Sequence, residues 1–450
     1  MRTRPLAVIN WRDADEGTRA RLLSRGTDRI FDPELRESIV EIVEDVRENG
    51  DAAVSRALAR FDNCDVPPDR LRVSEQEFSA ARSAVDAELQ EALRVAIAGI
   101  RAFNEHLARE REWRVEIRPG LVVGEKVTPI ASAGLFVPSG KGSFPSVLAQ
   151  LGAPAVVAGV PEIAVVVPPV PGGSGEVDPA VLCVAQELGI AQVFRANGPA
   201  GVAALAFGTE RIPRVRKVLG PGSPPVQVAQ IECQRFGTHT QVLLGPSESL
   251  IIADDSADVD ILAADLLNEA EHGPDSSSLL VTDSEQLVAD VQDAVAERLG
   301  RLPEPRRSYA LQALGVNGGA IVTRDLVEAT DVANAYAPEH MLVVTRDDEA
   351  VLGRLEHAGE ILLGQHTPIS AANYVLGVPA ALPTGGFARV TSGVTAESFL
   401  KRTSIARADA GVLRALAPAI VALSDHEGFP AHAAAVRARL QGGDGGTGRP

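Results

Sequence analysis

Two pairs of glutamate and histidine could carry metal or acid–base chemistry. Glu269 and His272 are three residues apart, in a segment that stops at Gly273-Pro274, as helix C-termini often do. At this spacing the carboxylate and the imidazole share one helix face, and such a pair is a common metal-ligand combination. A solvated helix end with a histidine near its negative dipole terminus would show the same residues. The spacing alone leaves both interpretations open.

The second pair is the dipeptide Glu339-His340, which lies just before a predicted strand, 341–344. A carboxylate and an imidazole side by side at a strand edge can accept protons with different strengths. A pair this short also occurs by chance, so it needs support from other residues.

Weaker polar signals follow further along the chain. His366 and Asn373 lie in a polar run after the predicted strand 361–363, and open α/β sheets place ligands in loops after strand ends. Glu427 and His432 belong to the sequence EGFPAH in a helical segment, where a surface turn with a chance histidine is the simpler explanation. His366 is equally compatible with a surface residue.

The elements that must position these residues follow from hydrophobic periodicity. Apolar residues at three- and four-residue steps predict helices over 33–62 and 87–111. From about residue 127, strand-length apolar runs alternate with helical segments, which is typical of parallel α/β layers. The predicted strands are 135–137, 163–167, 193–194, 242–244, 249–253, 279–282, 320–323, 341–344 and 361–363. We therefore expect two α/β lobes, followed by a helical segment from about residue 394.

Composition excludes several classes of protein. The chain has 450 residues, 45% of them hydrophobic and 23% charged, as expected for a globular protein of two or three lobes. A formal charge of −17 opposes nucleic-acid binding. Three cysteines without a CxxC pair favour a reduced setting. The N-terminus has no signal-peptide core, and no apolar run approaches the ~20 residues of a membrane helix. We expect a cytoplasmic protein without a membrane partner.

Glycine-rich turns at 138–142 (PSGKG) and 220–223 (GPGS) lack the G-x-G-x-x-G pattern that opens a helix, so the dinucleotide fingerprint is absent. The ordered set of motifs is far more specific than any one of them. GLFVPSG, AALAFGTE with KVLGPG, GPSES, EAEHGPDS, APEH, LPT and E-x-x-x-x-H occur in this order. This set resembles the histidinol dehydrogenase family from about residue 35 to 440.

The resemblance implies an α/β fold with two incomplete Rossmann-like parallel-sheet lobes, one inserted in the other, and small N- and C-terminal helical segments. The implied parts are an N-terminal segment (1–34), a first lobe with the metal and catalytic residues (35–134 plus 247–393), an inserted lobe that binds NAD (135–246), a C-terminal helical segment exchanged in a homodimer (394–440) and a flexible tail (441–450).

The resemblance also implies an activity. In this family a zinc ion holds an amino alcohol while NAD accepts two hydrides in succession, so that the alcohol becomes an aldehyde and then a carboxylate. By position, His340 resembles the base that deprotonates the alcohol, and Glu339 resembles the base that activates water for attack on the aldehyde. Ser247 and Glu427 fall at substrate-contact positions. Glu427 and His432 would come from the partner chain of the dimer.

The residues at the metal positions differ from the usual set. Family members usually have Gln, His, Asp and His, whereas this chain has Glu269, His272, Asn373 and His432. The acid and the amide have exchanged places, so the total ligand charge stays at about −1. We interpret this as a metal site that is kept but reoriented.

The NAD and substrate positions depart further. Phe136, Ala200 and Ser223 replace a Tyr, a Gln and an Asn, and each change removes or shortens a polar contact of about 0.5–1.5 kcal/mol. Ala380 replaces a histidine that helps to hold the substrate. The leading interpretation is a zinc- and NAD-dependent dehydrogenase of L-histidinol or another small polar alcohol. The alternatives are a metal-dependent hydrolase or lyase, and a non-catalytic binding protein.

Overall fold

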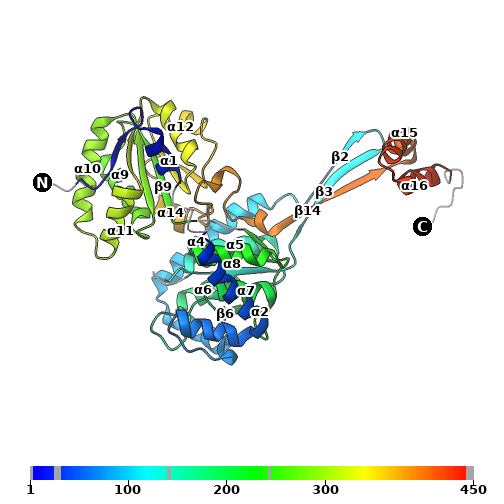
Figure 1. The fold of residues 1–450 in the computed structure, drawn as a ribbon, viewed down its shortest axis with the longest axis horizontal. Helices are drawn as coiled ribbons and strands as arrows, with labels where there is room; N and C mark the ends of the chain where they lie inside the picture. Colours follow the sequence, from blue (N-terminus) through cyan, green and yellow to red (C-terminus); the bar gives the residue numbers. More distant parts are fainter. Residues whose placement is uncertain (1–3, 25–31, 139–142, 242–244, 442–450) are drawn as a thin grey trace. The chain divides into compact units, whose positions relative to one another are not determined.

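The structure is a computed structural model that describes residues 4–24, 32–138, 143–241 and 245–441 (Figure 1). Contacts divide the chain into a larger unit, Met1–His106 with Ile130–Phe399, and a smaller unit, Leu107–Pro129 with Leu400–Pro450. The larger unit contains two parallel sheets, which confirms the predicted fold class. The predicted strand 242–244, residues 139–142 of the PSGKG turn and residues 442–450 of the predicted tail lie outside the described residues.

One sheet of the larger unit has five parallel strands in the order β6-β5-β4-β7-β8. Two of its central strands, 133–136 and 163–167, are continuous apolar runs, because a parallel sheet is covered on both faces. The strands of this sheet are β4 (Ala133–Phe136), β5 (Ile163–Val167), β6 (Gln192–Arg195), β7 (Lys217–Leu219) and β8 (His239–Gln241). The helices between them are α5 (Pro145–Ala158), α6 (Pro179–Glu187), α7 (Gly198–Phe207) and α8 (Pro224–Gln234).

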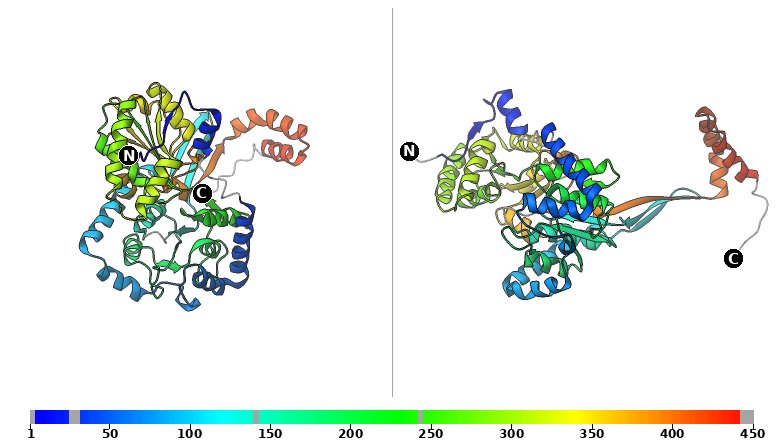
Figure 2. Two further views of the ribbon diagram at one scale, coloured as in Figure 1. Left: turned by 60° about the vertical axis from the view of Figure 1, so that its left-hand side comes forward. Right: turned by 60° about the horizontal axis from the view of Figure 1, so that its bottom comes forward.

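Residues 33–107 form three helices, α2 (Pro33–Phe61), α3 (Glu75–Ala84) and α4 (Ala87–Leu107). α2 lies against α7 and α8, and α3 lies against α6 (Figures 1 and 2). Ile39 and Val43 of α2 share one buried core with Val166 of β5. The predicted assignment of residues 35–134 to the other lobe is therefore wrong, because periodicity identifies the buried face of a helix but not the sheet that covers it.

The second sheet has six parallel strands in the order β1-β11-β10-β9-β12-β13. They are β1 (Val8–Asn10), β9 (Glu248–Ala253), β10 (Ser277–Thr282), β11 (Gly319–Val322), β12 (His340–Val344) and β13 (Glu360–Leu363). β1 belongs to the stretch predicted as a separate segment, 1–34, but it extends the sheet beside β11. Three residues are too few to reveal a strand by alternation.

Helices cover both faces of the six-stranded sheet. One buried core includes Leu342 of β12 with residues of α9 and α10, and the opposite core includes Met341 with residues of α12. The helices of this lobe are α1 (Glu16–Ser24), α9 (Val259–Ala270), α10 (Glu285–Leu299), α11 (Arg306–Gln312), α12 (Leu326–Tyr336), α13 (Asp348–Leu352) and α14 (Ile369–Tyr374). None of the helices in the described parts of the chain could span a membrane.

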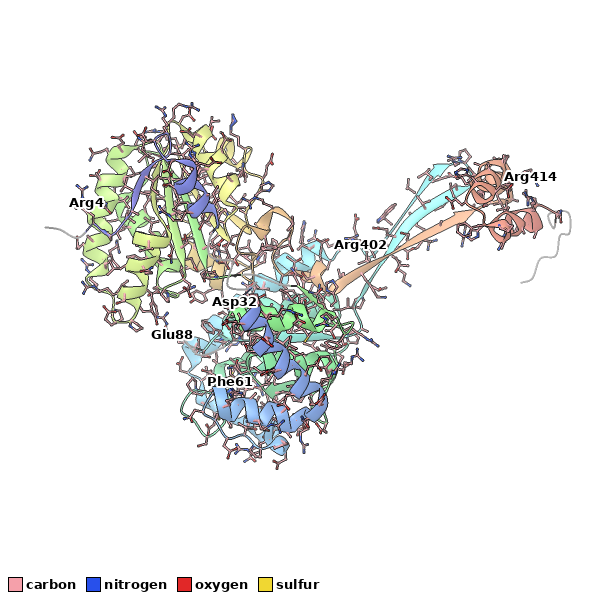
Figure 3. All side chains as sticks on the ribbon, viewed as in Figure 1. Arg4, Asp32, Phe61, Glu88, Arg402 and Arg414 are labelled. Atoms are coloured by element: carbon pink, nitrogen blue, oxygen red, sulfur yellow. The ribbon has the colours of Figure 1, made fainter. Side chains whose placement is uncertain are left out.

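The smaller unit is an antiparallel sheet, β14-β3-β2, with two packed helices. Its elements are β2 (Glu112–Arg118), β3 (Leu121–Pro129), β14 (Leu400–Ala408), α15 (Ala410–His426) and α16 (Pro430–Gln441). Figure 3 marks this unit by Arg402 on β14 and Arg414 on α15. The prediction that residues 394–440 are wholly helical is wrong for β14, because its pairing with β3 is a long-range contact that local composition does not show.

Candidate active site

The candidate site lies at the amino-terminal edge of the six-stranded sheet. Glu248, His340 and Glu360 are the first residues of β9, β12 and β13. These strands are parallel neighbours, so their first residues lie along one edge. α9 follows β9 and returns to this edge, where Glu269 lies in its last turn. The chain therefore gathers acidic and imidazole side chains at the end of the sheet where helices finish.

Three of the four predicted metal ligands lie together at this edge. Glu269 is buried, and its Oε2 lies 3.0 Å from His272 Nδ1. The Asn373 side-chain amide donates to Glu269 Oε1 at 3.0 Å. Burial lowers the pKa of His272, but the hydrogen bond and charge of Glu269 outweigh it and raise the pKa overall. The carboxylate and the imidazole are thus one interacting pair, and the solvated helix end considered above does not describe Glu269.

Asn373 reaches the cluster by an unexpected route. Its loop was expected to place ligands at the carboxyl end of β13, but the chain enters α14 there and Asn373 lies near the end of that helix. The side chain therefore meets Glu269 at the amino-terminal edge. The expectation about the sheet end was wrong, although the residue it singled out belongs to the cluster. The His366 side chain is exposed.

Glu339 and His340 form the second part of the site. His340 Nε2 lies 3.7 Å from Glu339 Oε1, and His340 Nδ1 lies 2.5 Å from Glu360 Oε1. The backbone N–H of Glu248 donates to Glu339 Oε2 at 3.0 Å. The Glu248 carboxylate accepts from Gly385 N–H at 2.9 Å. Each acidic group is therefore held by a hydrogen bond or by an imidazole.

Burial and mutual charge shift the pKa values of these groups. Burial raises the pKa of Glu339 to about 8, against the opposing effect of His340. Burial would lower the pKa of His340, but nearby carboxylates, chiefly Glu339 and Glu269, raise it to about 10. Burial would raise the pKa of Glu269, but its hydrogen bond with His272 and the charge of His340 lower it to about 2. Groups whose pKa values are driven apart in this way are suited to divided acid–base roles.

The predicted substrate-contact residue Ser247 lies beside the metal-ligand candidates. Its Oγ is 3.1 Å from His272 Nδ1, and its carbonyl accepts from Ser277 N–H at 3.0 Å. Glu427 and His432 belong to the smaller unit; Glu427 is the C-cap residue that follows α15, and His432 lies on α16. Their side chains are exposed, and their assignment to the site stays a prediction.

The side chains gathered at this edge supply part of a metal site. Glu269, His272 and Asn373 offer a carboxylate, an imidazole and an amide oxygen, and a zinc site uses four donors or three with an open position. Over the residues that the structure describes, no three His, Cys, Asp or Glu side chains gather into a metal site. The cluster therefore fits an incomplete site that needs a fourth donor from elsewhere.

The residues predicted to contact NAD lie at the carboxyl edge of the five-stranded sheet. Phe136 ends β4, Ala200 lies in the first turn of α7, and Ser223 precedes α8. The Phe136 and Ala200 side chains are buried in the core, whereas Ser223 is exposed. α5, α7 and α8 begin after strands of this sheet, and helix N-termini favour phosphate groups. The helix N-termini at this edge are suited to phosphate groups, and the role of the three residues stays a prediction.

Sequence reasoning missed Glu248 and Glu360. Both are buried carboxylates at the first position of a strand; the backbone N–H of Glu248 contacts Glu339, and the carboxylate of Glu360 contacts His340. The available signal was a charged residue opening an otherwise apolar strand, as in the sequence Glu360–Leu363. A buried charge at such a place requires a partner.

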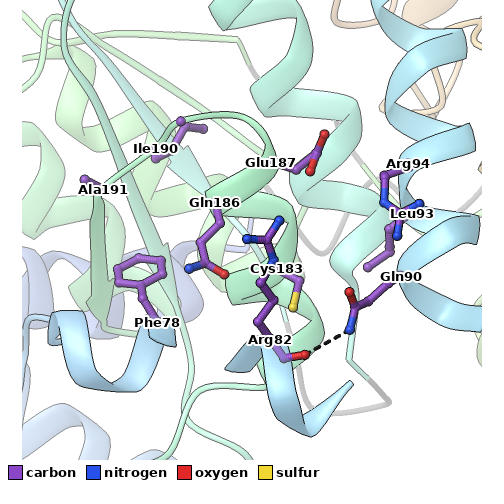
Figure 4. A pocket seen from close by; sticks show the side chains of 11 residues that line it. Phe78, Arg82, Gln90, Leu93, Arg94, Cys183, Gln186, Glu187, Ile190 and Ala191 are labelled. Atoms are coloured by element: carbon purple, nitrogen blue, oxygen red, sulfur yellow. Dashed lines mark hydrogen bonds between the residues drawn. The ribbon is translucent and has the colours of Figure 1, made fainter. Parts of the chain in front are cut away.

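A separate pocket of about 420 Å³ lies among α3, α4 and α6, and contains none of the candidate residues (Figure 4). Arg82, Gln90 and Cys183 are among its lining residues, and Gln90 donates to the Arg82 carbonyl at 2.9 Å.

The fold and the site together define an α/β protein with two Rossmann-like sheets and a buried acid–imidazole cluster suited to metal-assisted proton transfer. The chain belongs to the histidinol dehydrogenase family. Residues 27–440 match the family model described as histidinol dehydrogenase. This confirms the family inferred from the motifs, and with it the prediction of an oxidoreductase of this type.

Individual relatives agree with this assignment. A histidinol dehydrogenase homolog of Colwellia psychrerythraea is 42% identical over 88% of this chain and 88% of its own. A histidinol dehydrogenase of Synechocystis is 40% identical over 89% of this chain and 91% of its own. The crystal structure of histidinol dehydrogenase from Elizabethkingia anophelis has a TM-score of 0.92 at 31% identity, covering 98% of this chain and 99% of that one.

Proposed function

We propose that this protein is a zinc- and NAD-dependent dehydrogenase that oxidises L-histidinol or another small polar alcohol through the aldehyde to the carboxylate. The observation that carries the proposal is the Glu339–His340 pair at the same sheet edge as Glu269, His272 and Asn373. Two proton-accepting side chains beside a set of metal donors are the arrangement that metal-assisted alcohol oxidation requires.

The two bases would act in different steps. His340 would take the proton of the alcohol hydroxyl through Nε2, the ring nitrogen that faces Glu339. Glu339 would take a proton from the water that attacks the aldehyde, and its raised pKa makes it a stronger base than an ordinary carboxylate. His340 is buried and Glu339 is only 12% exposed, which limits the escape of a reactive aldehyde into solvent.

The cofactors would be held by separate parts of the larger unit. Glu269, His272 and Asn373 would hold zinc, and the carboxyl edge of the five-stranded sheet would hold NAD. When bound, zinc lowers the pKa of a substrate hydroxyl or water, and NAD accepts one hydride in each oxidation. A cation held by Glu269 would also offset part of the carboxylate attraction that raises the pKa of His340, bringing the imidazole closer to neutrality.

We also propose a cytoplasmic homodimer in which the partner chain supplies Glu427 and His432. Trp113, Val115 and Ile117 are exposed on β2, and their alternate positions place them on one face of this edge strand. An exposed apolar row on a sheet edge is suited to pairing with a second copy. Three free cysteines, two of them buried, fit a reducing compartment.

Two observations bear on the side group of the substrate. Relatives at similar identity carry both the name histidinol dehydrogenase and the name homolog. Ala380, which stands where the resemblance places a substrate-holding histidine, has no polar side chain, and its backbone N–H donates to Gln150 at 3.2 Å. This favours a substrate that differs from histidinol in its side group.

A metal-dependent hydrolase or lyase is the second candidate. The burial of the Phe136 and Ala200 side chains favours it, because neither can offer a polar contact to NAD. In that case Glu339 would still activate water, and no hydride would be transferred.

The deciding experiment titrates the purified protein with zinc, NAD and a panel of alcohols that includes L-histidinol, and follows NADH. NADH with histidinol supports the narrow proposal, and NADH with another alcohol supports a related dehydrogenase. Retained zinc with no NADH from any alcohol would favour the hydrolase or lyase. The paired variant Glu339→Gln/His340→Gln should abolish NADH formation. Its matched control is Glu356→Gln/His357→Gln, because Glu356-His357 repeats the same dipeptide with an exposed glutamate.

A further inference from the structure

Glu360 and His340 are paired by the register of the sheet. They are directly opposite each other at the starts of β13 and β12, so their side chains lie on the same face of two neighbouring parallel strands. Glu360 Oε1 lies 2.5 Å from His340 Nδ1, and both side chains are buried. The contact is therefore built by the strand pairing.

The backbone around this contact is fixed on both sides. Glu360 N–H donates to the Glu339 carbonyl at 3.1 Å, and Gly359 N–H donates to the Pro338 carbonyl at 2.9 Å. A Cβ atom on Gly359 would lie 2.5 Å from the Glu339 carbonyl oxygen, so only glycine allows this approach. Strand β13 is thus held against the Glu339-His340 dipeptide. Moving Glu360 away from His340 would break these backbone hydrogen bonds.

The buried Glu360 carboxylate is not explained by a contribution to folding stability. Its second oxygen, Oε2, is buried and has no hydrogen-bond partner among the described residues. Burial of an incompletely paired charge opposes folding, and apolar replacement of such a pair is often neutral or stabilising. Among the described residues, the one hydrogen-bond partner of the Glu360 carboxylate is the imidazole of His340.

The chemistry of the contact fixes the direction of the hydrogen bond. An ionised carboxylate can only accept, so His340 Nδ1–H donates to Glu360. Nε2 is then the ring nitrogen left to accept a proton, and it faces Glu339 at 3.7 Å. A carboxylate that orients a basic imidazole in this way recurs in enzymes with a histidine base.

We infer that Glu360 is a positioning residue: it fixes the ring orientation and tautomer of His340 so that Nε2 serves as the proton acceptor. This inference rests on the proposed role of His340 as the base that deprotonates the alcohol. Glu360 itself touches neither substrate nor cofactor and acts only through the imidazole.

The kinetic test compares Glu360→Ala, Glu360→Gln and the exposed control Glu356→Gln. Glu360→Ala should lower kcat about 10- to 100-fold, with KM changed less than about twofold. Glu360→Gln retains an oxygen that accepts from Nδ1, so it should recover part of the loss. Glu356→Gln should match the wild type. Unchanged kcat in Glu360→Ala, or a loss in Glu360→Gln as large as in Glu360→Ala, would overturn the inference.

A spectroscopic test is independent of substrate. Long-range ¹H–¹⁵N spectra of the full chain with labelled histidine report the tautomer of each ring, and His340→Asn identifies the His340 signals. At a pH where His340 is neutral, the wild type should carry the proton on Nδ1, and Glu360→Ala should shift it toward Nε2. An unchanged tautomer would overturn the inference. If no alcohol yields NADH, the proposed function fails, whereas this spectrum still decides whether Glu360 orients His340.

Discussion

The substitution Asp265→Asn should stabilise the larger unit above about pH 6. Asp265 lies within α9, is only 7% exposed, and its Oδ2 is buried without a hydrogen-bond partner among the described residues. Burial raises its pKa from 3.8 to about 6. At about 1.4 kcal/mol for each pKa unit, ionisation of this carboxylate in the folded state costs about 3 kcal/mol. Asparagine has nearly the same shape and cannot ionise.

The sign of the pH dependence follows from proton binding. Between pH 4 and pH 6 the folded state retains the Asp265 proton and the unfolded state has lost it, so stability falls as the pH rises through this window. Above about pH 6 both states are ionised and the full cost remains. Asp265→Asn should therefore gain about 1–3 kcal/mol at pH 7.5, with little gain at pH 4.

The assay is urea unfolding of wild type and Asp265→Asn at several pH values, read as the midpoint and slope of the transition. Asp260→Asn on the exposed first turn of the same helix is the control, and its effect should stay small. A stability gain from Asp265→Asn that is equal at pH 4 and pH 7.5 would refute the reasoning, because an effect of ionisation must vanish below the pKa.

Three further predictions concern the site and the dimer. Glu339→Gln should slow aldehyde oxidation about 100-fold or more while slowing alcohol oxidation less; alcohol and aldehyde are supplied separately, and equal losses would contradict the division of roles. His272→Ala and His432→Ala should each lower bound zinc in the dimer, as measured by elemental analysis, and undiminished zinc would remove that histidine from the site. Trp113→Glu should shift sedimentation from dimer toward monomer, because it places a charge on the exposed apolar row of β2; an unchanged dimer would exclude this row from the interface.

The sequence predicted the parallel sheets because their strands are continuous apolar runs, such as Ile163–Val167, separated by helical periodicity. It did not predict the partner of α2, since the stripe that includes Ile39 would suit any apolar surface. β14 was missed for a related reason. Its stability comes from pairing with β3, from Leu400 opposite Pro129 to Ala408 opposite Leu121, and residues so far apart in sequence leave no local sign.

The site was predictable in its residues but not in its geometry. The spacing of Glu269 and His272 correctly indicated a shared helix face, and their side chains interact. The predicted end of the sheet was wrong. The rule for open α/β sheets places ligands beyond the carboxyl ends of the strands, whereas this site lies at their amino-terminal ends. Glu360 was missed because its importance depends on strand register, which places it opposite His340.

The position of the candidate site at the amino-terminal edge of the six-stranded sheet has an electrostatic reason. α9, α12 and α14 all finish beside the site, at Ala270, Tyr336 and Tyr374, and helix C-termini carry partial negative charge. With buried carboxylates such as Glu269 and Glu248, this edge is suited to a cation. The five-stranded sheet presents helix N-termini at its carboxyl edge, which is suited to the phosphates of a dinucleotide. Each sheet would therefore bind its ligand at the end whose helix dipoles have the opposite charge. A metal at the six-stranded sheet and NAD at the five-stranded sheet would then require no G-x-G-x-x-G fingerprint.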